Sequence, residues 1–420
     1  MTNTQTHYAS LLGFFLFAFS ALLLFGLAFF LGVSLLLMYL KAGAFAVPAA
    51  IYVFTTAFLG ILVSAAAVAA LLRFLNQPAA HAPVSTAFPA WQIGAGILGG
   101  GLALFVGYLI QYNQAVNWLI LPLLTVPAVM LPLWTIVGLG VRGISLGSRW
   151  RTWGALGVSL TLTPFVLVVI EIILIIIIIV LVVVYVGAQP NLTAEFERLA
   201  AQLMFLDLET EMGMDAMLRL ITPLLMRPAV LLPILMMFSL LIPLVEELFK
   251  PLVVWIFARR LESPAQGFAF GALSGAGFAI WETFNASGQM NEWGSVLVSR
   301  IGTGLLHVTT SALMGLAIFL AWRERRYLRL LGTYLLVVLL HGIWNAAAIM
   351  VSFSALSVEY LQTGGFRSLQ WISSGVLVAL IGILLAILLM NNRRLRQAAA
   401  APPVEAALPA ADSDNMPKDV

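Results

Sequence analysis

The sequence of 420 residues contains no cysteine, and only 9% of its residues are charged. Without cysteine the protein has no disulfide, no thiolate metal ligand and no cysteine nucleophile. A soluble domain carries about a quarter charged residues, so the scarcity of charge excludes a soluble enzyme, a nucleic-acid-binding protein and a disordered scaffold. Hydrophobic residues make up 62% of the chain, and the mean hydropathy is +1.03. The composition therefore predicts a protein with several membrane spans.

A membrane-spanning helix needs about 20 consecutive apolar residues, and the sequence has ten such stretches. A transmembrane β-barrel would alternate apolar and polar residues, whereas the run from Ile172 to Val184 is apolar throughout. We therefore predict an all-α transmembrane bundle of about ten spans. The predicted spans are residues 10–38, 45–72, 93–111, 117–140, 154–186, 229–257, 267–287, 301–322, 330–353 and 371–390.

Arginines gather after every second predicted span. Short loops rich in Lys and Arg stay in the cytoplasm, and the loops on the opposite side are neutral, acidic or sparsely charged, with Lys41 as the exception. We therefore predict that both termini lie in the cytoplasm. The arginines concerned are Arg73, Arg142, Arg149, Arg151, Arg259, Arg260, Arg323, Arg325, Arg326, Arg329, Arg393, Arg394 and Arg396.

Ionisable residues inside a span cost about 2.5–3.5 kcal/mol each on insertion scales and usually mark function. The first four predicted spans contain essentially none, and the fifth holds Glu171 alone, for which an interhelical partner or protonation in place is the default expectation. The second half of the chain is therefore predicted to carry the functional site. Its polar residues inside spans are Glu246, Glu247 and Lys250, then Glu282, then His307, and then His341 with Asn345.

Helical spacing indicates which of these side chains share a face, because residues three or four apart are neighbours on a helix. Glu246 and Glu247 lie four and three residues before Lys250, so one ammonium can neutralise either carboxylate. A glutamate beside a second carboxylate and an ammonium is suited to act as a general base. His341 and Asn345 are four residues apart and offer two donors to a developing oxyanion.

Taken in order, these residues resemble the motifs of the PrsW family of intramembrane proteases, which is related to the CAAX-protease and bacteriocin-processing group. The resemblance covers about residues 229–350. One departure is Thr283, which follows Glu282 where the family commonly has asparagine. The matching motifs are Glu246-Glu247-x-x-Lys250, Phe278-x-x-x-Glu282, His307 followed eight residues later by Gly315, and His341-x-x-Trp344-Asn345.

The resemblance implies an endopeptidase of the bacterial cytoplasmic membrane. It would hydrolyse membrane-embedded or juxtamembrane protein substrates with glutamate-activated water, as in the regulated proteolysis of anti-sigma factors. The expected partners are a membrane-protein substrate and the bilayer, and the oligomeric state stays open.

The same resemblance assigns roles to the residues of the four motifs. Glu246 or Glu247 would activate water and Lys250 would tune the pair. Glu282 and His307 would position the water or shuttle its proton, and His341 with Asn345 would stabilise the tetrahedral oxyanion. No cofactor is required by this mechanism. Zinc stays open, because two histidines and a carboxylate can hold it, with His307, His341, Glu247 and Glu282 as the candidate ligands.

The sequence lacks the residues that other intramembrane protease mechanisms require. No aspartate lies in a predicted span, which excludes an aspartyl dyad. Neither His307 nor His341 belongs to an HExxH zinc motif. Ala272 stands where a serine protease of the Gly-x-Ser-Gly type needs its first glycine.

Two alternative functions also fit a polar cluster within a membrane. Glu, Lys and His inside helices form proton relays in transporters, so a proton-coupled small-solute transporter is one alternative. Transporters with inverted repeats have matching broken helices in both halves, and no such match is seen in the first half of this chain. A catalytically silent scaffold is the other alternative. Only the protease would cleave a membrane substrate without an ion gradient.

The predicted spans and motifs divide the chain into six parts. They are an N-terminal tail (1–9), a five-span membrane module (10–186), an amphipathic extracytoplasmic segment (187–228), a four-span catalytic core (229–353), a loop with the last span (354–396) and a disordered cytoplasmic tail (397–420).

Overall fold

The computed structural model describes residues 7–208, 210–288, 293–361 and 365–400. These residues form helices and no β-strand, which confirms the prediction of an all-α protein. In chain order the helices are α1 (Tyr8–Ala42), α2 (Val47–Phe74), α3 (Pro78–His81), α4 (Ala90–Ile110), α5 (Asn117–Val141), α6 (Arg149–Leu160), α7 (Leu162–Gly187), α8 (Pro190–Met204), α9 (Glu211–Leu225), α10 (Pro228–Met236), η1 (Met237–Leu241), α11 (Ile242–Phe249), α12 (Leu252–Phe257), η2 (Ala258–Arg260), α13 (Pro264–Ser287), α14 (Trp293–Glu324), α15 (Tyr327–Tyr360) and α16 (Gly365–Ala400).

Nine helical segments of the described chain are long and apolar enough to cross a membrane, so this is a multi-pass membrane protein. The difference from the ten predicted spans is the segment 267–287. It forms α13, whose 24 residues are mostly buried and include many glycines and alanines. Small residues are typical of helices that pack closely against other membrane helices, and they leave α13 less apolar than the nine.

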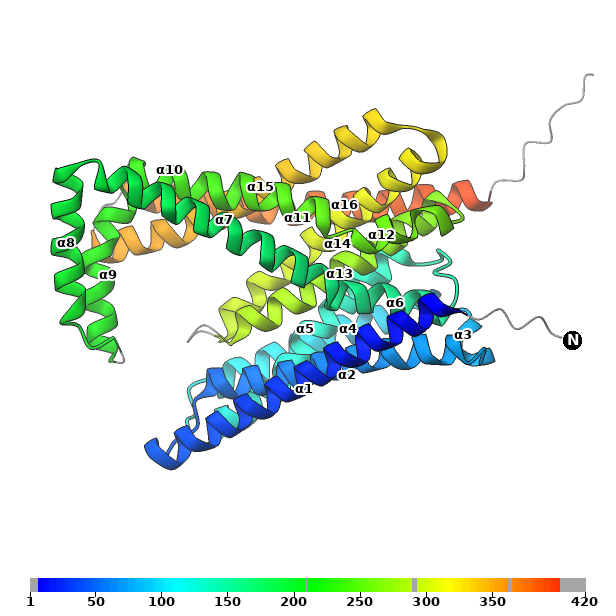
Figure 1. The fold of residues 1–420 in the computed structure, drawn as a ribbon, viewed down its shortest axis with the longest axis horizontal. Helices are drawn as coiled ribbons and strands as arrows, with labels where there is room; N and C mark the ends of the chain where they lie inside the picture. Colours follow the sequence, from blue (N-terminus) through cyan, green and yellow to red (C-terminus); the bar gives the residue numbers. More distant parts are fainter. Residues whose placement is uncertain (1–6, 209, 289–292, 362–364, 401–420) are drawn as a thin grey trace, which may run out of the picture.

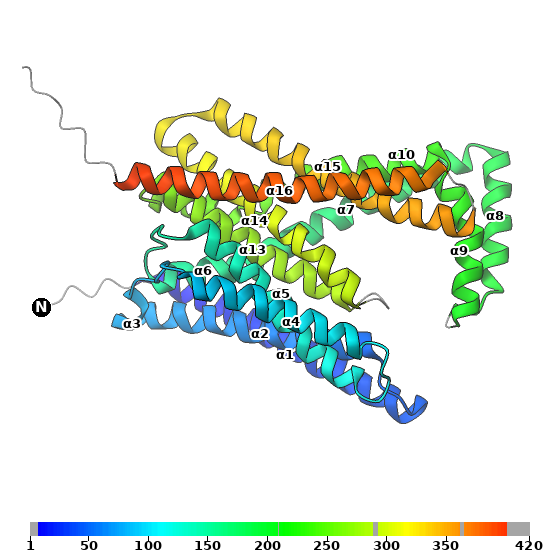
Figure 2. The ribbon, with the colours of Figure 1, turned by 180° about the vertical axis from the view of Figure 1, so that it is seen from behind.

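The helices lie in three groups that are stacked across the long axis of the molecule (Figures 1 and 2). α1, α2, α4 and α5 form one side, α13 and α14 the middle, and α15, α16 and the α10–α11 run the other side. The first turn of α1 and the last turn of α16 lie at the same end of the bundle (Figure 1). The compartment that this end faces stays a prediction from the arginines.

A stripe of glycines joins α13 to α14. Gly267, Gly271 and Gly275 recur every four residues and therefore share one helix face. A side-chain carbon at Gly271 would collide with the carbonyl oxygen of Ser311, and one at Gly275 with that of His307. The two backbones approach as closely as in other small-residue membrane helix pairs. This close packing sets the position of His307 relative to α13.

The segment 187–228 forms α8 and α9, which cross the far end of the bundle (Figure 1). An ion pair of 2.6 Å joins Glu195 of α8 to Arg227, which precedes α10. The hydrogen bond from Arg227 lowers the pKa of the Glu195 carboxyl. This ion pair ties α8 to the start of α10, the helix that leads into the predicted core.

Several boundaries differ from their predicted positions. The helix α16 continues to Ala400, so residues 397–400 of the predicted disordered tail are helical, because alanine and glutamine favour helix. The remaining tail residues, 401–420, and residues 1–6 of the N-terminal tail lie outside the described residues. The predicted single span 154–186 is broken at Thr161, which separates α6 from α7.

Candidate functional site

The helix that carries the two adjacent glutamates changes its hydrogen-bonding pattern just before them. Pro243 has no N–H group and therefore cannot bond the carbonyl of Ser239, four residues earlier. The preceding turn widens into the π-helix η1, a feature frequent at functional sites. A second proline, Pro251, directly follows Lys250, and α11 ends at Phe249. The sequence thus places the Glu-Glu-x-x-Lys motif on a short helix between two irregular turns.

The ammonium group of Lys250 lies at the centre of a buried polar cluster. Its Nζ atom lies 2.6 Å from Glu246 Oε2 and 3.0 Å from Glu247 Oε1. The same atom lies 2.8 Å from His307 Nδ1 and 3.3 Å from His341 Nδ1. The structure therefore brings five of the seven predicted site residues into one group, from α11 and its end, α14 and α15.

Each histidine of this cluster also contacts a carboxylate. The Nε2 atom of His307 lies 2.7 Å from Oε2 of Glu282 on α13, and His341 Nδ1 lies 2.8 Å from Glu247 Oε1. The Lys250 ammonium donates to His307 Nδ1, so the His307 Nε2–H group donates to Glu282. Glu282 is thereby the sixth predicted residue at the site. It reaches the cluster through His307.

Accessibility differs across the cluster. The side chains of Glu247 and Lys250 are 0% exposed, and that of Glu246 is 11% exposed. Glu282 is 29% exposed and lies at the edge. The ring of Phe278 covers another side, with its centre 4.9 Å from the Lys250 ammonium. The cluster is therefore enclosed, and its accessible edge lies beside Glu246 and Glu282.

Asn345, the seventh predicted residue, bonds outside the cluster. Its Nδ2 atom donates to the carbonyl oxygen of Phe238 in η1 at 2.8 Å. Pro243 lies five residues after Phe238 and has no N–H group to complete a π-type bond to that carbonyl. The close approach of α15 at this level is allowed by Gly342, where a side-chain carbon would collide with the Ser239 carbonyl. The amide of Asn345 therefore supports the broken helix in this structure.

We expect Asn345→Ala to destabilise the fold by about 1 kcal/mol, because it removes one hydrogen bond to a carbonyl that Pro243 leaves without its helical partner. The measurement is the midpoint of thermal unfolding of the detergent-purified protein. An unchanged midpoint combined with a loss of cleavage would instead assign Asn345 to the oxyanion role that the resemblance implied.

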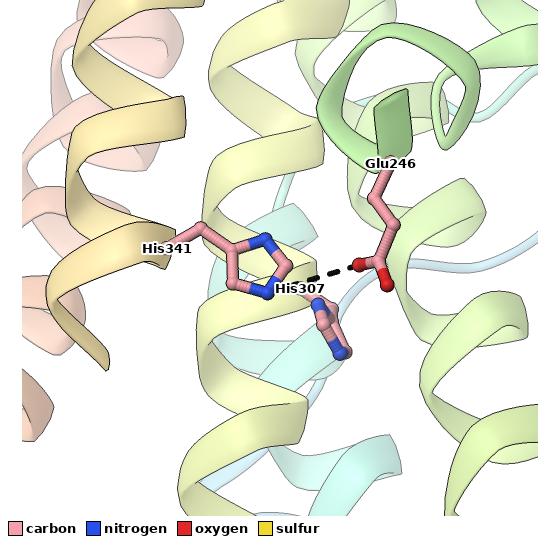
Figure 3. A group of neighbouring side chains, drawn as sticks. All are labelled: Glu246, His307 and His341. Carbon is pink, nitrogen blue, oxygen red and sulfur yellow. Dashed lines mark ion pairs between the residues drawn. The ribbon is translucent and has the colours of Figure 1, made fainter. Parts of the chain in front are cut away.

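Three of the cluster residues also fit a metal centre. Within the described residues, Glu246, His307 and His341 each offer one ligand atom, and these atoms lie within 4.8 Å of one another. Figure 3 shows the three side chains converging from α11, α14 and α15. Two imidazoles and a carboxylate can hold zinc with an open position. The donor set therefore fits the metal that the sequence left open.

The carboxylates behind the histidines add to this fit. Metal-binding histidines usually donate their other ring N–H group to a carboxylate or carbonyl, and Glu282 and Glu247 hold His307 and His341 in this way. These two glutamates were candidate ligands from the sequence, and Glu246 takes that place in the geometry. The Lys250 ammonium also contacts Glu246 and His307. A metal ion bound there would compete with this ammonium for the two side chains.

Sequence reasoning missed Arg300, which donates to Glu282 Oε1 at 3.0 Å. The predicted span began at 301, whereas α14 begins at Trp293 and includes the arginine. Its spacing could have identified it from the sequence, because Arg300 precedes His307 by seven residues, or about two helical turns, and so shares its helix face. Glu171, the lone ionisable residue of the fifth predicted span, lies on α7.

The fold and the cluster define a multi-pass membrane protein with an enclosed centre of carboxylates, lysine and histidines. Residues 216–381 match the model of the PrsW family, described as intramembrane metalloproteases. The matched residues include all seven predicted site residues. No curated protein and no solved structure matches the chain. This match agrees with the resemblance drawn from the motifs and supports an intramembrane protease at the family level.

Proposed function

We propose that this protein is an endopeptidase that hydrolyses a peptide bond of a membrane-embedded or juxtamembrane protein with a glutamate-activated water. The observation that carries the proposal is the buried contact of Lys250 with two carboxylates and two imidazoles. Such a group is expensive to bury in a membrane protein and usually marks function. It combines a proton acceptor, a proton relay and a positive charge, the three elements that peptide hydrolysis requires.

Glu247 is the general base in this proposal. Its Oε2 atom is buried and has no hydrogen-bond partner among the described residues. A buried polar atom without a partner calls for a water, an ion or a catalytic role, and this carboxylate oxygen suits a proton from the attacking water. The water oxygen bonds to the peptide carbonyl carbon as Glu247 takes the proton.

Glu247 and Lys250 complete the reaction in this proposal. Glu247, which His341 contacts at 2.8 Å, returns the proton it took from water to the leaving nitrogen as the carbon–nitrogen bond breaks. The Lys250 ammonium stabilises the negative charge that develops on the carbonyl oxygen. In this proposal Lys250 stabilises the oxyanion, a role that the resemblance assigned in part to the amide of Asn345.

The metal that the family description names would be held by Glu246, His307 and His341. Bound there, zinc would act as a Lewis acid and lower the pKa of a water. Glu282 and Glu247 orient the two imidazoles for this task through hydrogen bonds of 2.7 and 2.8 Å. These two hydrogen bonds come from the protein itself, so they orient both rings without a bound metal.

The proposed substrate is a membrane protein of the bacterial cytoplasmic membrane, with anti-sigma factors as one substrate class that the resemblance implies. The accessible edge of the cluster lies beside Glu282, toward the end of α13 that the arginine pattern assigns to the outside. We propose that the substrate enters from that edge. The arginine-rich loops would then lie on the cytoplasmic side.

The experiment is cleavage of a tagged candidate membrane substrate by detergent-purified protein, with and without a strong chelator. We expect cleavage without any ion gradient, its loss after chelation and its return with added zinc. Chelator-insensitive cleavage would contradict the metal and retain the glutamate mechanism. Proton flux in vesicles with no cleavage of any substrate tested would contradict the protease and support the transporter.

A further inference from the structure

A chain of three hydrogen bonds runs from the edge of the site to its centre. Arg300 Nη1 lies 3.0 Å from Glu282 Oε1, and Glu282 Oε2 lies 2.7 Å from His307 Nε2. On its other side His307 lies 2.8 Å from Lys250 Nζ. Arg300 is the outermost member of this chain, and neither the motifs nor the proposed mechanism uses it.

We propose that Arg300 is a positioning residue that acts through Glu282 to hold the His307 imidazole with Nδ1 turned toward the cluster. Its consequence for catalysis rests on the proposed function. The orientation itself does not, because it concerns one ring and its hydrogen-bond partners.

The geometry explains how a residue two turns away can control the ring. Arg300 and His307 share one face of α14, and Glu282 reaches that face from α13. The guanidinium takes one carboxylate oxygen, which leaves the other directed at His307 Nε2. Charge-assisted bonds of this kind are shorter and stronger than neutral ones. With the carboxylate held at both oxygens, the ring has one fixed acceptor.

The helix pair on which this depends is itself closely packed. Gly275 of α13 lies against the His307 carbonyl of α14, where a side-chain carbon would not fit. Glu282 is seven residues after Gly275, or about two turns along the same face of α13. The backbones therefore fix the distance that the carboxylate of Glu282 spans between Arg300 and His307.

An arginine suits this position because the membrane penalises a lone charge. Glu282 is partly buried in a helix that other helices enclose, and a charged carboxylate there needs a partner. The guanidinium remains charged in proteins and offers several donors in one plane. It contacts Glu282 without reaching Lys250 or the two adjacent glutamates, so it stabilises the carboxylate and leaves the centre unchanged.

The test is nitrogen NMR of the full-length protein in detergent with ¹⁵N-labelled histidine. The chain has four histidines, and a His307→Gln sample assigns the signals of His307. We expect wild-type His307 to carry its proton on Nε2, with Nδ1 unprotonated. Arg300→Gln should mix the two tautomers, and Arg300→Lys should retain most of the wild-type spectrum. Identical His307 signals in wild type and Arg300→Gln would overturn the proposal.

A double-variant cycle separates positioning from packing. If Arg300 acts through Glu282, Arg300→Gln adds no further change to the His307 spectrum in a Glu282→Gln protein. An additional change of similar size in that background would overturn the route through Glu282. The spectra need no substrate, so a failure of this proposal is distinguishable from a failure of the proposed proteolysis.

The same variants give a kinetic readout once a substrate is cleaved. Loss of a residue that orients a metal-binding or catalytic histidine typically costs about 10–100-fold, so we expect kcat to fall by that factor in Arg300→Gln with KM little changed. The matched control is Arg151→Gln, which removes a similar ion pair with Glu262 away from the site. An equal fall of kcat in both variants would indicate general destabilisation and overturn the positioning role.

Discussion

Glu247→Gln is expected to lower the cleavage rate by about 10²–10⁴-fold, the usual contribution of a general base. The amide has nearly the shape of the carboxylate and cannot take a proton from water. It also removes the charge that pairs with Lys250 at 3.0 Å, and its remaining oxygen still accepts from His341. The measurement is single-turnover cleavage of a tagged membrane substrate, with His341→Ala run beside it as a second inactive variant.

The matched control is Glu262→Gln, the same substitution at a carboxylate with a 70% exposed side chain. Its ion pair with Arg151 lies at the surface, where such pairs contribute little, so we expect wild-type cleavage. Full activity of a folded Glu247→Gln protein would contradict the assignment of the base. If Glu246→Gln were inactive in that case, the role would pass to Glu246.

Lys250→Met is expected to destabilise the protein by about 3–5 kcal/mol, because removal of one partner of a buried ion pair leaves an uncompensated charge. The ammonium contacts Glu246 and Glu247, and its own side chain is 0% exposed. Methionine retains the length of the side chain and its packing on Phe278. The measurement is the shift in unfolding midpoint of the purified protein in detergent.

A second substitution identifies the cause of that loss. Adding Glu246→Gln to Lys250→Met removes one of the two unpaired carboxylates, so we expect part of the lost stability to return. A double variant that is less stable than Lys250→Met by the full cost of Glu246→Gln alone would show that the two residues act independently. It would contradict a stabilising role for the ion pair.

The ordered motifs predicted much of the site. Residues three and four apart on one helix share a face, so the contacts of Lys250 with both glutamates follow from spacing alone. The contacts of His307 and His341 with Lys250 join residues 57 and 91 positions apart. The resemblance grouped these residues, but spacing within one helix contains no information on which ring nitrogen faces which atom.

Two departures from the sequence expectation have local causes. Asn345 shares a helix face with His341, yet the carbonyl that Pro243 leaves unpaired in the π-helix attracts its amide. Arg300 lies outside the apolar stretch that defined its span, although α14 extends past it to Trp293. Asn345 bonds the unpaired carbonyl of Phe238 in η1, and Arg300 bonds the carboxylate of Glu282 on α13. In both cases a polar group on a neighbouring helix determines the contact.

The sequence alone predicts a helical membrane bundle and a polar centre in its second half, because apolar run length and the cost of intramembrane charge act on each segment separately. Four motifs in order also predict the resemblance to the PrsW family, whose model residues 216–381 match. The tertiary structure decides that Lys250 is the centre, that Glu246 lies beside the two histidines, and that Glu282 bridges Arg300 to His307. These contacts depend on how closely α11, α13, α14 and α15 approach, which is a property of packing between helices.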